Sequence, residues 1–549
     1  MPVENEFRFT SRRSPVYGMG GMVATSQPLA VAAGLEILSQ GGNAADAAIA
    51  TAAALNVTEP TSTGLGGDCF ALYYEASSGE ITALNGSGRA PANLSLERLY
   101  HEGFTNEIPP FHAYTITVPG ACAGWCDLLE RHGRLRLGQV LAPAIRLAER
   151  GYPVAPITAY FWKRSADRLS QVPGGIELTI HGRAPHVGEI FRNPGLAHTL
   201  EKISEGGKVA FYQGEIAESI ANVILQAGGC MTVDDLAAHT STWEQPISIT
   251  YRGYRVWECP PNGQGLAALL ALNLLEGYEL NSLPPLSARR LHLMIEAMRL
   301  AFADTRWYVA DPAYSPAPLD QLLSKDYATS RRRLIDPHRA TLDQVHGTPT
   351  LSSDTVYLTT VDGDGNACSF INSNYMGFGT GIVPSGWGFS LQNRGLGFSL
   401  DPSHPNVLAP GKRPYHTIIP AMLTIDANRP SKIHNRLYAS LGVMGGYMQP
   451  QGHMQVVVSL VDDALDPQVA LDQPRFCIED STTGGRVALE EGVSTEVQAE
   501  LSRMGHDIYS VSGYARAIFG RGQIIRREAD TGVLWGGSDP RADGCAMTL

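Results

Sequence analysis

The segment LSSDTVYLTTVDGDGNACSFINSNYMGFGTG, residues 351–381, decides the fold. Two runs rich in β-branched and aromatic residues, 355–361 and 367–375, lie on either side of the turn sequence DGDGN. Two such runs joined by an Asp/Gly/Asn turn predict a β-hairpin. The polar stretch 340–354 before them has neither helical nor strand periodicity. The first strand therefore begins abruptly, at Thr355.

A threonine at this position has a chemical use. If the bond between Asp354 and Thr355 is cut, Thr355 gains a free α-amino group beside its own hydroxyl. An α-amine has an ordinary pKa of ~7.7–8.0, so it can act as the general base for that hydroxyl near neutral pH. The alternative is that Thr355 is only a β-branched residue that begins a strand, and this segment alone favours that alternative.

The rest of the chain favours Thr355 as a nucleophile over Thr355 as an ordinary strand residue, because it carries a series of further motifs in a fixed order. The motifs are GGMVATSQPLAVAAGLEILSQGGNAADAAIA (20–50), TSTGLGGDCF (61–70), TVPGACAG (117–124), DLAAHTSTWEQPISITYRGYRV (235–256), FADTRWYVADP (302–312), TVYLTTVD (355–362), FGTG (378–381), GKRP (411–414) and the pair Gly445-Gly446. This series resembles the γ-glutamyltranspeptidase family of N-terminal-nucleophile hydrolases over almost the whole chain.

The resemblance implies an α+β fold, a four-layer αββα sandwich, in a precursor that cuts itself into a large subunit, 1–354, and a small subunit, 355–549. It implies an amidohydrolase or acyltransferase that cleaves γ-glutamyl amides such as glutathione through an acyl-threonine intermediate, with water or an amine as acceptor. We expect no organic cofactor and no metal, because the sequence shows neither a nucleotide-binding loop nor a cluster of metal ligands. A catalytically silent binding protein on the same fold is the alternative from another class, and an uncleaved chain would favour it.

The resemblance also assigns roles to four residues around the cleavage site, Asp354–Thr355. Thr355 is the implied nucleophile, and Ser373 occupies the place of a second hydroxyl that hydrogen-bonds it. For Ser373 an ordinary strand serine is an equally good interpretation. Gly445 and Gly446 match the family's oxyanion hole, where backbone N–H groups approach a developing negative charge.

The positions that would bind substrate depart from the family pattern. The acidic residue that holds the substrate's α-ammonium in γ-glutamyl enzymes falls on Gly397. The α-carboxylate arginine falls on Ser87, which makes Arg89 a displaced candidate. The other candidates for substrate binding are Tyr375, Asn393, Arg394, His416 and Thr417. These departures resemble a short-lid, glutathione-hydrolase-like branch that includes an oxamate amidohydrolase, so the alternative substrate is a small deamino amide such as oxamate or a glutaryl amide.

Composition narrows the class of protein. The chain has 549 residues, 44% hydrophobic and 17% charged, which fits a globular protein with a large core. A net charge of −12 without basic runs argues against nucleic-acid and anionic-membrane partners, so we expect a small-molecule substrate. The eight cysteines form no CxxC pair and are expected to be reduced core residues. The N-terminus has no apolar run of the signal-peptide kind, which favours the cytoplasm. A homodimer of processed protomers stays open.

Two motifs that suggest ligands fail on inspection. DGDGN starts like a calcium loop, but Ala367 and Ser373 stand where such a loop needs Gly and Glu. GLGGD at 64–68 lacks both the Lys-Ser/Thr of a phosphate loop and the GxGxxG spacing, so it predicts tight backbone packing near a pocket. The fifteen histidines show no HExxH spacing, and no metal site is expected.

Periodicity predicts the other elements. Residues 20–58 read as a strand and two Ala-rich helices, the second capped by Asn43, and 70–91 as a hairpin turning at Ser78-Gly79. Residues 115–335 are mainly helical, interrupted by a hairpin within 247–265. After Thr355 the chain is expected to be strand-rich through 425, followed by a loop, a strand at 437–446 and a helix at 448–462.

Overall fold

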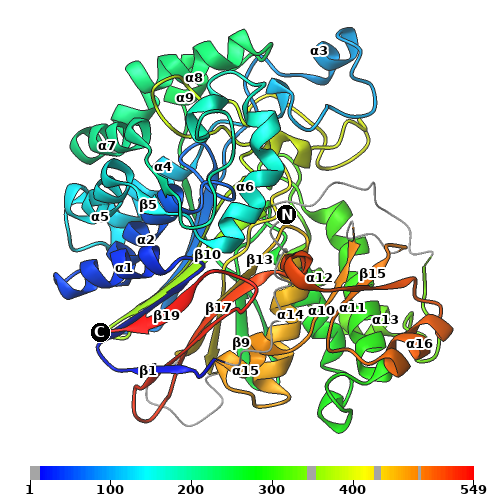
Figure 1. The fold of residues 1–549 in the computed structure, drawn as a ribbon. Helices are drawn as coiled ribbons and strands as arrows, with labels where there is room; N and C mark the ends of the chain where they lie inside the picture. The colour runs from blue at the N-terminus through cyan, green and yellow to red at the C-terminus, as the bar shows by residue number, and fades with distance from the viewer. Residues whose placement is uncertain (1–12, 343–353, 426–434, 480–483) are drawn as a thin grey trace, which may run out of the picture.

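Two β-sheets pack face to face at the centre of the molecule (Figure 1). The computed structural model describes residues 13–342, 354–425, 435–479 and 484–549. The first sheet contains, in order, β1 (Val16–Gly18), β18 (Leu534–Ser538), β17 (Arg521–Arg527), β13 (Arg436–Met444), β12 (Ala421–Ile425), β9 (Tyr254–Glu258) and β8 (Ile247–Tyr251). The second contains β19 (Cys545–Thr548), β2 (Gly21–Thr25), β10 (Asp354–Asp362), β11 (Ala367–Tyr375), β3 (Asp68–Glu75), β4 (Glu80–Gly86) and β7 (Thr242–Glu244).

The predicted hairpin forms the middle of the second sheet. Strands β10 and β11 are antiparallel, with Thr359 opposite Ser369. Their register shifts between Asp354 and Val356, which is a β-bulge at the start of the hairpin. Most of the preceding irregular segment, residues 343–353, lies outside the described residues. The hairpin prediction is confirmed, and Thr355 lies at the bulge.

Both sheets contain strands from the expected large subunit and from the expected small subunit. In the second sheet β10 and β11 lie between β2 and β3, and the C-terminal strand β19 pairs with β2. In the first sheet β12 pairs with β9. Backbone ladders therefore cross the proposed junction at 354–355 several times, so a cut there would leave the two pieces bound to each other.

Helices cover the outer face of each sheet (Figure 1). On the second sheet lie α1 (Pro28–Ser39), α2 (Ala44–Thr58), α4 (Ala121–His132), α5 (Leu137–Arg150) and α7 (Pro194–Tyr212), which share one apolar core with that sheet. On the first sheet lie α10 (Gly265–Leu275), α11 (Ala288–Tyr308) and α14 (Met448–Val461), which share a second core. A third core, including Met22, Tyr357 and Met422, fills the space between the sheets. These four layers confirm the predicted αββα sandwich.

The alanine-rich pair of helices shows how local sequence sets this architecture. The side chain of Asn43 accepts hydrogen bonds from the N–H groups of Ala45 and Asp46, and the carboxylate of Asp46 accepts one from the N–H of Asn43. This capping box begins α2 at the predicted place. Every residue of α2 is buried, because its small side chains pack against neighbouring helices on one side and β10 and β11 on the other.

Smaller elements complete the described chain. The shorter helices are α3 (Leu96–His101), α6 (Pro156–Leu169), α8 (Glu215–Gln226), α9 (Val233–Ala237), α12 (Leu319–Leu322), α13 (Lys325–Arg332), α15 (Pro467–Asp472) and α16 (Thr495–Arg503). The outlying strands are β5 (Tyr152–Pro153), β6 (Ile190–Phe191), β14 (Phe476–Ile478), β15 (Val487–Glu490) and β16 (Ile508–Val511). Across the described residues, no helix has the length and apolarity that crossing a bilayer requires.

One prediction about the second half of the chain is wrong. Residues 376–420 were expected to be strand-rich, but they form loops with a single short 3-10 turn, Arg394–Gly397, and isolated bridges such as Ser399 with Val407. Glycines and prolines recur through this stretch and prevent a continuous ladder. These loops are nevertheless largely buried, and they bring several of the candidate residues to the end of β11.

Candidate active site

Thr355 is buried at the end of the second sheet where the bulge opens. Its side chain has no solvent exposure. The bulge places Ser373 and Asn374 opposite Thr355, because Asp354 pairs with Tyr375 and Val356 with Asn372. Thr355 Oγ1 donates to Ser373 Oγ at 3.2 Å, as the resemblance implied. Gln449 Nε2, from the first turn of α14, donates to Thr355 Oγ1 at 3.4 Å.

The Ser373 hydroxyl connects Thr355 to a buried guanidinium group. Ser373 Oγ accepts a hydrogen bond from Arg394 Nη2 at 3.2 Å, in addition to the bond from Thr355. Arg394 Nη1 donates to Thr417 Oγ1 at 2.6 Å. The Arg394 guanidinium also stacks on the ring of Tyr375, with its carbon 4.3 Å from the ring centroid. The structure thus brings Thr355, Ser373, Tyr375, Arg394 and Thr417 into one cluster.

Arg394 carries a charge that this cluster does not neutralise by direct pairing. Its side chain is fully buried, and in the described part of the chain no carboxylate forms an ion pair with it. Burial lowers the pKa of Arg394 to about 10, although the negative charge of Asp68 acts in the opposite direction. A buried guanidinium whose partners are neutral hydroxyls favours an anion close by. The arrangement therefore suits a substrate carboxylate next to Thr355.

His416 pairs with an acidic residue that the sequence did not single out. His416 Nε2 lies 3.0 Å from Asp68 Oδ2, and Asp68 Oδ1 accepts from Gln392 Nε2 at 2.9 Å and from two backbone N–H groups. Burial alone would raise the pKa of Asp68, but the hydrogen bond from His416 and the charge of Arg394 bring it below its ordinary value. Burial and Arg394 lower the pKa of His416 to about 3. The pair therefore consists of a carboxylate and a neutral imidazole that donates to it.

The GLGGD sequence places Asp68 there through close backbone contacts. A Cβ added at Gly66 would lie 2.1 Å from the carbonyl oxygen of Ser390, and one at Gly67 would lie 2.3 Å from that of Ser373. Only glycine allows the chain to approach these carbonyls so closely. The prediction of tight backbone packing is confirmed, and the packing sets Asp68 at the start of β3 beside the cluster.

Gly445 and Gly446 form the turn between β13 and α14. Their φ angles are 123° and 60°, in the region that favours glycine. Gln264 Nε2 donates to the carbonyl of Gly446 at 2.8 Å, which holds the turn in place. Within the described residues, neither glycine's N–H donates a hydrogen bond to the protein. Two N–H groups held in this way, on the same turn as Gln449, suit the stabilisation of an oxyanion at Thr355.

A further arginine connects this turn to the backbone of Thr355. Arg521 Nη2 donates to the carbonyl of Thr355 at 3.3 Å, and its Nη1 pairs with Glu59 at 3.0 Å. The preceding residue, Gly520, packs against Gly445: a Cβ added at Gly445 would lie 3.4 Å from its Cα. Arg521 thereby links Glu59, the residue directly after α2 in the expected large subunit, to the first residue of the small one.

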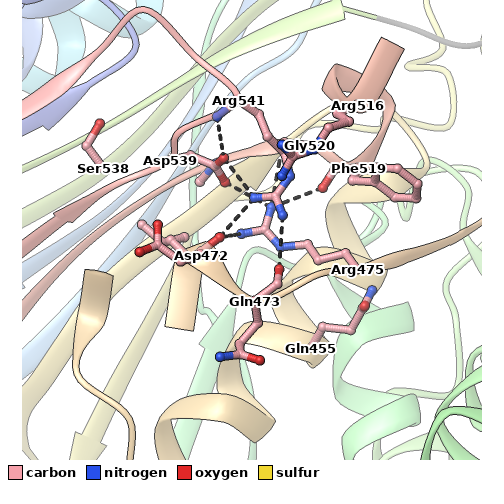
Figure 2. A network of polar contacts seen from close by, with 12 residues as sticks. Gln455, Asp472, Gln473, Arg475, Arg516, Phe519, Gly520, Ser538, Asp539 and Arg541 are labelled. Atoms are coloured by element: carbon pink, nitrogen blue, oxygen red, sulfur yellow. Dashed lines mark hydrogen bonds and ion pairs between the residues drawn. The ribbon is translucent and has the colours of Figure 1, made fainter. Parts of the chain in front are cut away.

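Figure 2 shows a buried network of charged side chains beneath the loop that carries Gly520. Arg475 Nη1 donates to the carbonyl of Phe519 at 3.0 Å and pairs with Asp539 at 2.9 Å (Figure 2). Arg541 pairs with Asp539 at 2.9 Å and with Glu490 at 2.5 Å. Because every member of such a network is costly to leave unpaired in the interior, it fixes the loop rigidly against Gly445.

Two predicted substrate-binding residues lie outside the cluster's hydrogen bonds. Arg89 Nη1 donates to the carbonyl of Thr240 at 3.2 Å, and it bonds none of the cluster residues. Asn393 accepts from the N–H of Met376 at 3.1 Å and donates to the carbonyl of Pro110 at 2.9 Å, so it holds the loop after β11. A Cβ added at Gly397 would lie 2.5 Å from the carbonyl oxygen of Tyr415, so an acidic side chain has no room there.

Three residues at the site were not predicted from the sequence. Asp68 is the last residue of the glycine-rich motif GLGGD, and this position was the signal that could have identified it. Gln449 lies three residues after the glycine pair, in the first turn of a predicted helix, where a polar side chain can point back toward the strand end. Arg521 begins a strand far along the chain and shows no local signal.

The family model for gamma-glutamyltranspeptidase matches residues 30–549. The chain belongs to the γ-glutamyltranspeptidase family. It is 36% identical over 545 residues to the glutathione hydrolase-like YwrD proenzyme of Bacillus subtilis, covering 97% of this chain and 99% of that protein. It is 32% identical over 540 residues to the oxamate amidohydrolase proenzyme of Klebsiella pneumoniae, covering 96% and 98%.

Among solved structures, the cephalosporin acylase from Bacillus halodurans is similar over 100% of this chain and 99% of its own, with 48% identity and a TM-score of 0.92. The γ-glutamyltranspeptidase of Helicobacter pylori is similar over 59% of this chain and 97% of the chain compared, with 30% identity and a TM-score of 0.54. This member of the γ-glutamyltranspeptidase family is therefore an enzyme with the N-terminal-nucleophile hydrolase fold.

Proposed function

We propose that this γ-glutamyltranspeptidase family member cuts its own chain between Asp354 and Thr355. Thr355 Oγ1 attacks the carbonyl carbon of Asp354, the peptide C–N bond breaks, and the proton moves to the nitrogen of Thr355. Water then hydrolyses the resulting ester, which frees the carboxyl of Asp354 and regenerates the hydroxyl. The products are the fragments 1–354 and 355–549, the second beginning with a free α-amine.

The mature enzyme would use the same hydroxyl to hydrolyse an amide. The α-amine of Thr355 takes the proton of Oγ1 as the hydroxyl attacks the substrate carbonyl, and the N–H groups of Gly445 and Gly446 stabilise the oxyanion. The proton passes to the leaving amine, and an acyl ester remains on Thr355. Water then completes hydrolysis, while an amine acceptor would complete a transfer.

The observation that carries the proposal is the buried hydrogen-bonded chain from Thr355 through Ser373 to Arg394. It supports an acyl group that ends in a carboxylate and lacks an α-ammonium, such as a glutaryl group or oxamate. Arg394 would repel an ammonium, and Gly397 leaves no room for an acidic partner. The name of one relative, the oxamate amidohydrolase, is consistent with this acyl class.

A γ-glutamyl amide is the second candidate. The name of the 36% identical relative, glutathione hydrolase-like, favours it. It would require a partner for the substrate's ammonium, and Asp68 is the acidic residue that the cluster offers. Each oxygen of Asp68 already accepts from the protein, so an ammonium would have to compete with His416 or Gln392.

Trapping the acyl intermediate tests this proposal. Purified protein is mixed with the p-nitroanilides of glutarate and γ-glutamate and with oxamate, quenched in acid and analysed by intact-mass spectrometry. We expect the acyl mass on the fragment that begins at Thr355, highest with the glutaryl substrate, and none on a Thr355→Ala variant. An acyl mass on another residue would disprove the assignment of the nucleophile.

A further inference from the structure

Away from Thr355, the fold brings a histidine and a glutamate of one helix together with a histidine that is distant in the sequence. His292 and Glu296 lie one turn apart on α11, and His506 lies between α16 and β16. All three side chains are buried, and one ligand atom of each lies within 4.8 Å of the other two. Within the described chain, none of the three bonds to the cluster around Thr355. Their role is therefore separate from the proposed hydrolysis.

The hydrogen bonds of His292 fix which of its nitrogens carries a lone pair. His292 Nε2 lies 2.7 Å from the carbonyl oxygen of Asp336, so this nitrogen carries the proton and donates it. His292 Nδ1 therefore accepts a hydrogen bond from His506 Nε2, at 2.8 Å, and an ion bound between these two nitrogens would replace that proton. A histidine that donates its other N–H to a backbone carbonyl is in the usual state of a metal ligand.

Glu296 is oriented in a similar way. Its Oε2 accepts from the N–H of Thr341 at 2.9 Å, while its Oε1 accepts no hydrogen bond from the described residues and forms a 3.5 Å ion pair with Arg299. One oxygen is thus held by the backbone, the other lies beside Arg299, and a carboxylate oxygen of Glu296 lies within 4.8 Å of a nitrogen of each histidine. Two imidazole nitrogens and one carboxylate oxygen are a donor set that Zn²⁺ binds, with a fourth position for water.

We propose that His292, Glu296 and His506 form a binding site for a divalent transition-metal ion such as Zn²⁺. A tetrahedral ion with bonds of about 2.0–2.1 Å holds its ligands about 3.4 Å apart, so side-chain shifts of about 1 Å would close the site. His292 and Glu296 belong to the expected large subunit and contact its last described segment, Asp336 to Thr341. His506 belongs to the small one. The ion would therefore tie the two pieces together.

Arg299 limits the affinity of this site. Its positive charge lies beside Glu296 and competes with the ion for the same carboxylate. Removing the charge should therefore strengthen metal binding, whereas removing a ligand should weaken it. A buried hydrogen-bonded cluster without a metal site would not give opposite changes in metal affinity for substitutions at Arg299 and at the ligands. The two kinds of substitution therefore distinguish a metal site from such a cluster.

The test uses full-length protein freed of metal by dialysis against a chelator, titrated with Zn²⁺ by calorimetry and with Co²⁺ by visible absorption. We expect one ion per chain with the absorption bands of a low-coordinate cobalt site. His506→Ala and Glu296→Gln should lower the affinity about 100-fold or more, and Arg299→Gln should raise it. His453→Gln is the matched control, because His453 also pairs with a buried glutamate, Glu258, at 2.7 Å.

If the wild type shows no heat of Zn²⁺ binding and no cobalt absorption bands, the proposal is overturned before any variant is measured. Binding that His506→Ala leaves unchanged would place the ion elsewhere and would overturn it too. A melting temperature measured without metal for each variant shows whether the substituted chain is folded. Zn²⁺ should raise the melting temperature of the wild type, of His453→Gln and of Arg299→Gln, but not that of His506→Ala or Glu296→Gln.

Discussion

Arg394 provides the sharpest test of substrate choice. Its guanidinium is fully buried, bonded to Ser373 and Thr417, and without a carboxylate partner among the described residues. A charge-assisted hydrogen bond contributes roughly 1.5–3 kcal/mol. Arg394→Ala should therefore lower kcat/KM for a glutaryl anilide by about 10- to 150-fold for one such bond, and by more if the fork binds both carboxylate oxygens.

The assay compares three p-nitroanilides, glutaryl, butyryl and γ-glutamyl, on processed protein. Butyryl has the same chain without the carboxylate, so its kcat/KM should change little in Arg394→Ala. The γ-glutamyl anilide should lose less than the glutaryl one, because the variant also removes repulsion of the ammonium. Arg394→Lys keeps the positive charge but loses the pair of parallel N–H donors of the guanidinium group. Its kcat/KM for the glutaryl anilide should lie between those of wild type and Arg394→Ala.

Two results would refute this reasoning. A strong wild-type preference for the γ-glutamyl anilide that Arg394→Ala leaves unchanged would mean that another residue binds the substrate's α-ammonium and α-carboxylate. An equal loss for butyryl and glutaryl anilides would mean that Arg394 supports the structure of the site and not the substrate carboxylate. The intact mass of each variant shows whether it has been processed, which separates a maturation defect from a catalytic one.

Three further predictions concern the nucleophile, the oxyanion site and acid stability. The value of kcat/KM should increase with pH through an apparent pKa below ~7.7–8.0, because burial and the charge of Arg521 both disfavour the protonated amine of Thr355. Arg521→Met should raise that apparent pKa. An apparent pKa that the substitution leaves unchanged would exclude an effect of the Arg521 charge. Gly445→Ala should lower kcat by roughly 10²–10³ in steady-state assays, since φ is 123° there and the N–H would move; near-normal kcat would exclude this N–H as an oxyanion donor. Burial and Arg394 lower the pKa of His416 to about 3 in the folded protein, so the imidazole takes up a proton at higher pH in the unfolded chain than in the folded one. The free energy of unfolding should therefore fall by roughly 1.4 kcal/mol per pH unit as the pH drops below ~6.5. Urea unfolding of wild type and of His416→Gln at pH 7 and pH 5 checks this, and an equal change in the free energy of unfolding for the two proteins would contradict it.

Features set by neighbours in the sequence could be predicted. Thr355 and Ser373 are 18 residues apart on adjacent strands of one hairpin, so their contact follows from the turn between them. The start of α2 follows from Asn43 and Asp46, which cap each other three residues apart. In both cases a short-range rule fixes the geometry before any tertiary packing occurs.

Contacts between distant segments could not be predicted in the same way. His292 and His506 are 214 residues apart, and their contact depends on how α16 packs on α11. Arg394 was a candidate for substrate binding, but its burial depends on the loops of 376–420, which were expected to be strand-rich. Those loops are ordered by side chains such as Asn393 bonded to backbone groups, and no periodicity reports such bonds.

The intact mass of the purified protein tests the central claim most directly. We predict two polypeptides from the wild type, one beginning at Thr355 and one ending at Asp354, which elute together from a size-exclusion column because strands of the two pieces pair in both sheets. Thr355→Ala should give one full-length chain with no activity. A single uncut chain from active wild type, or a Thr355→Ala protein cut at the same bond, would contradict self-processing by Thr355.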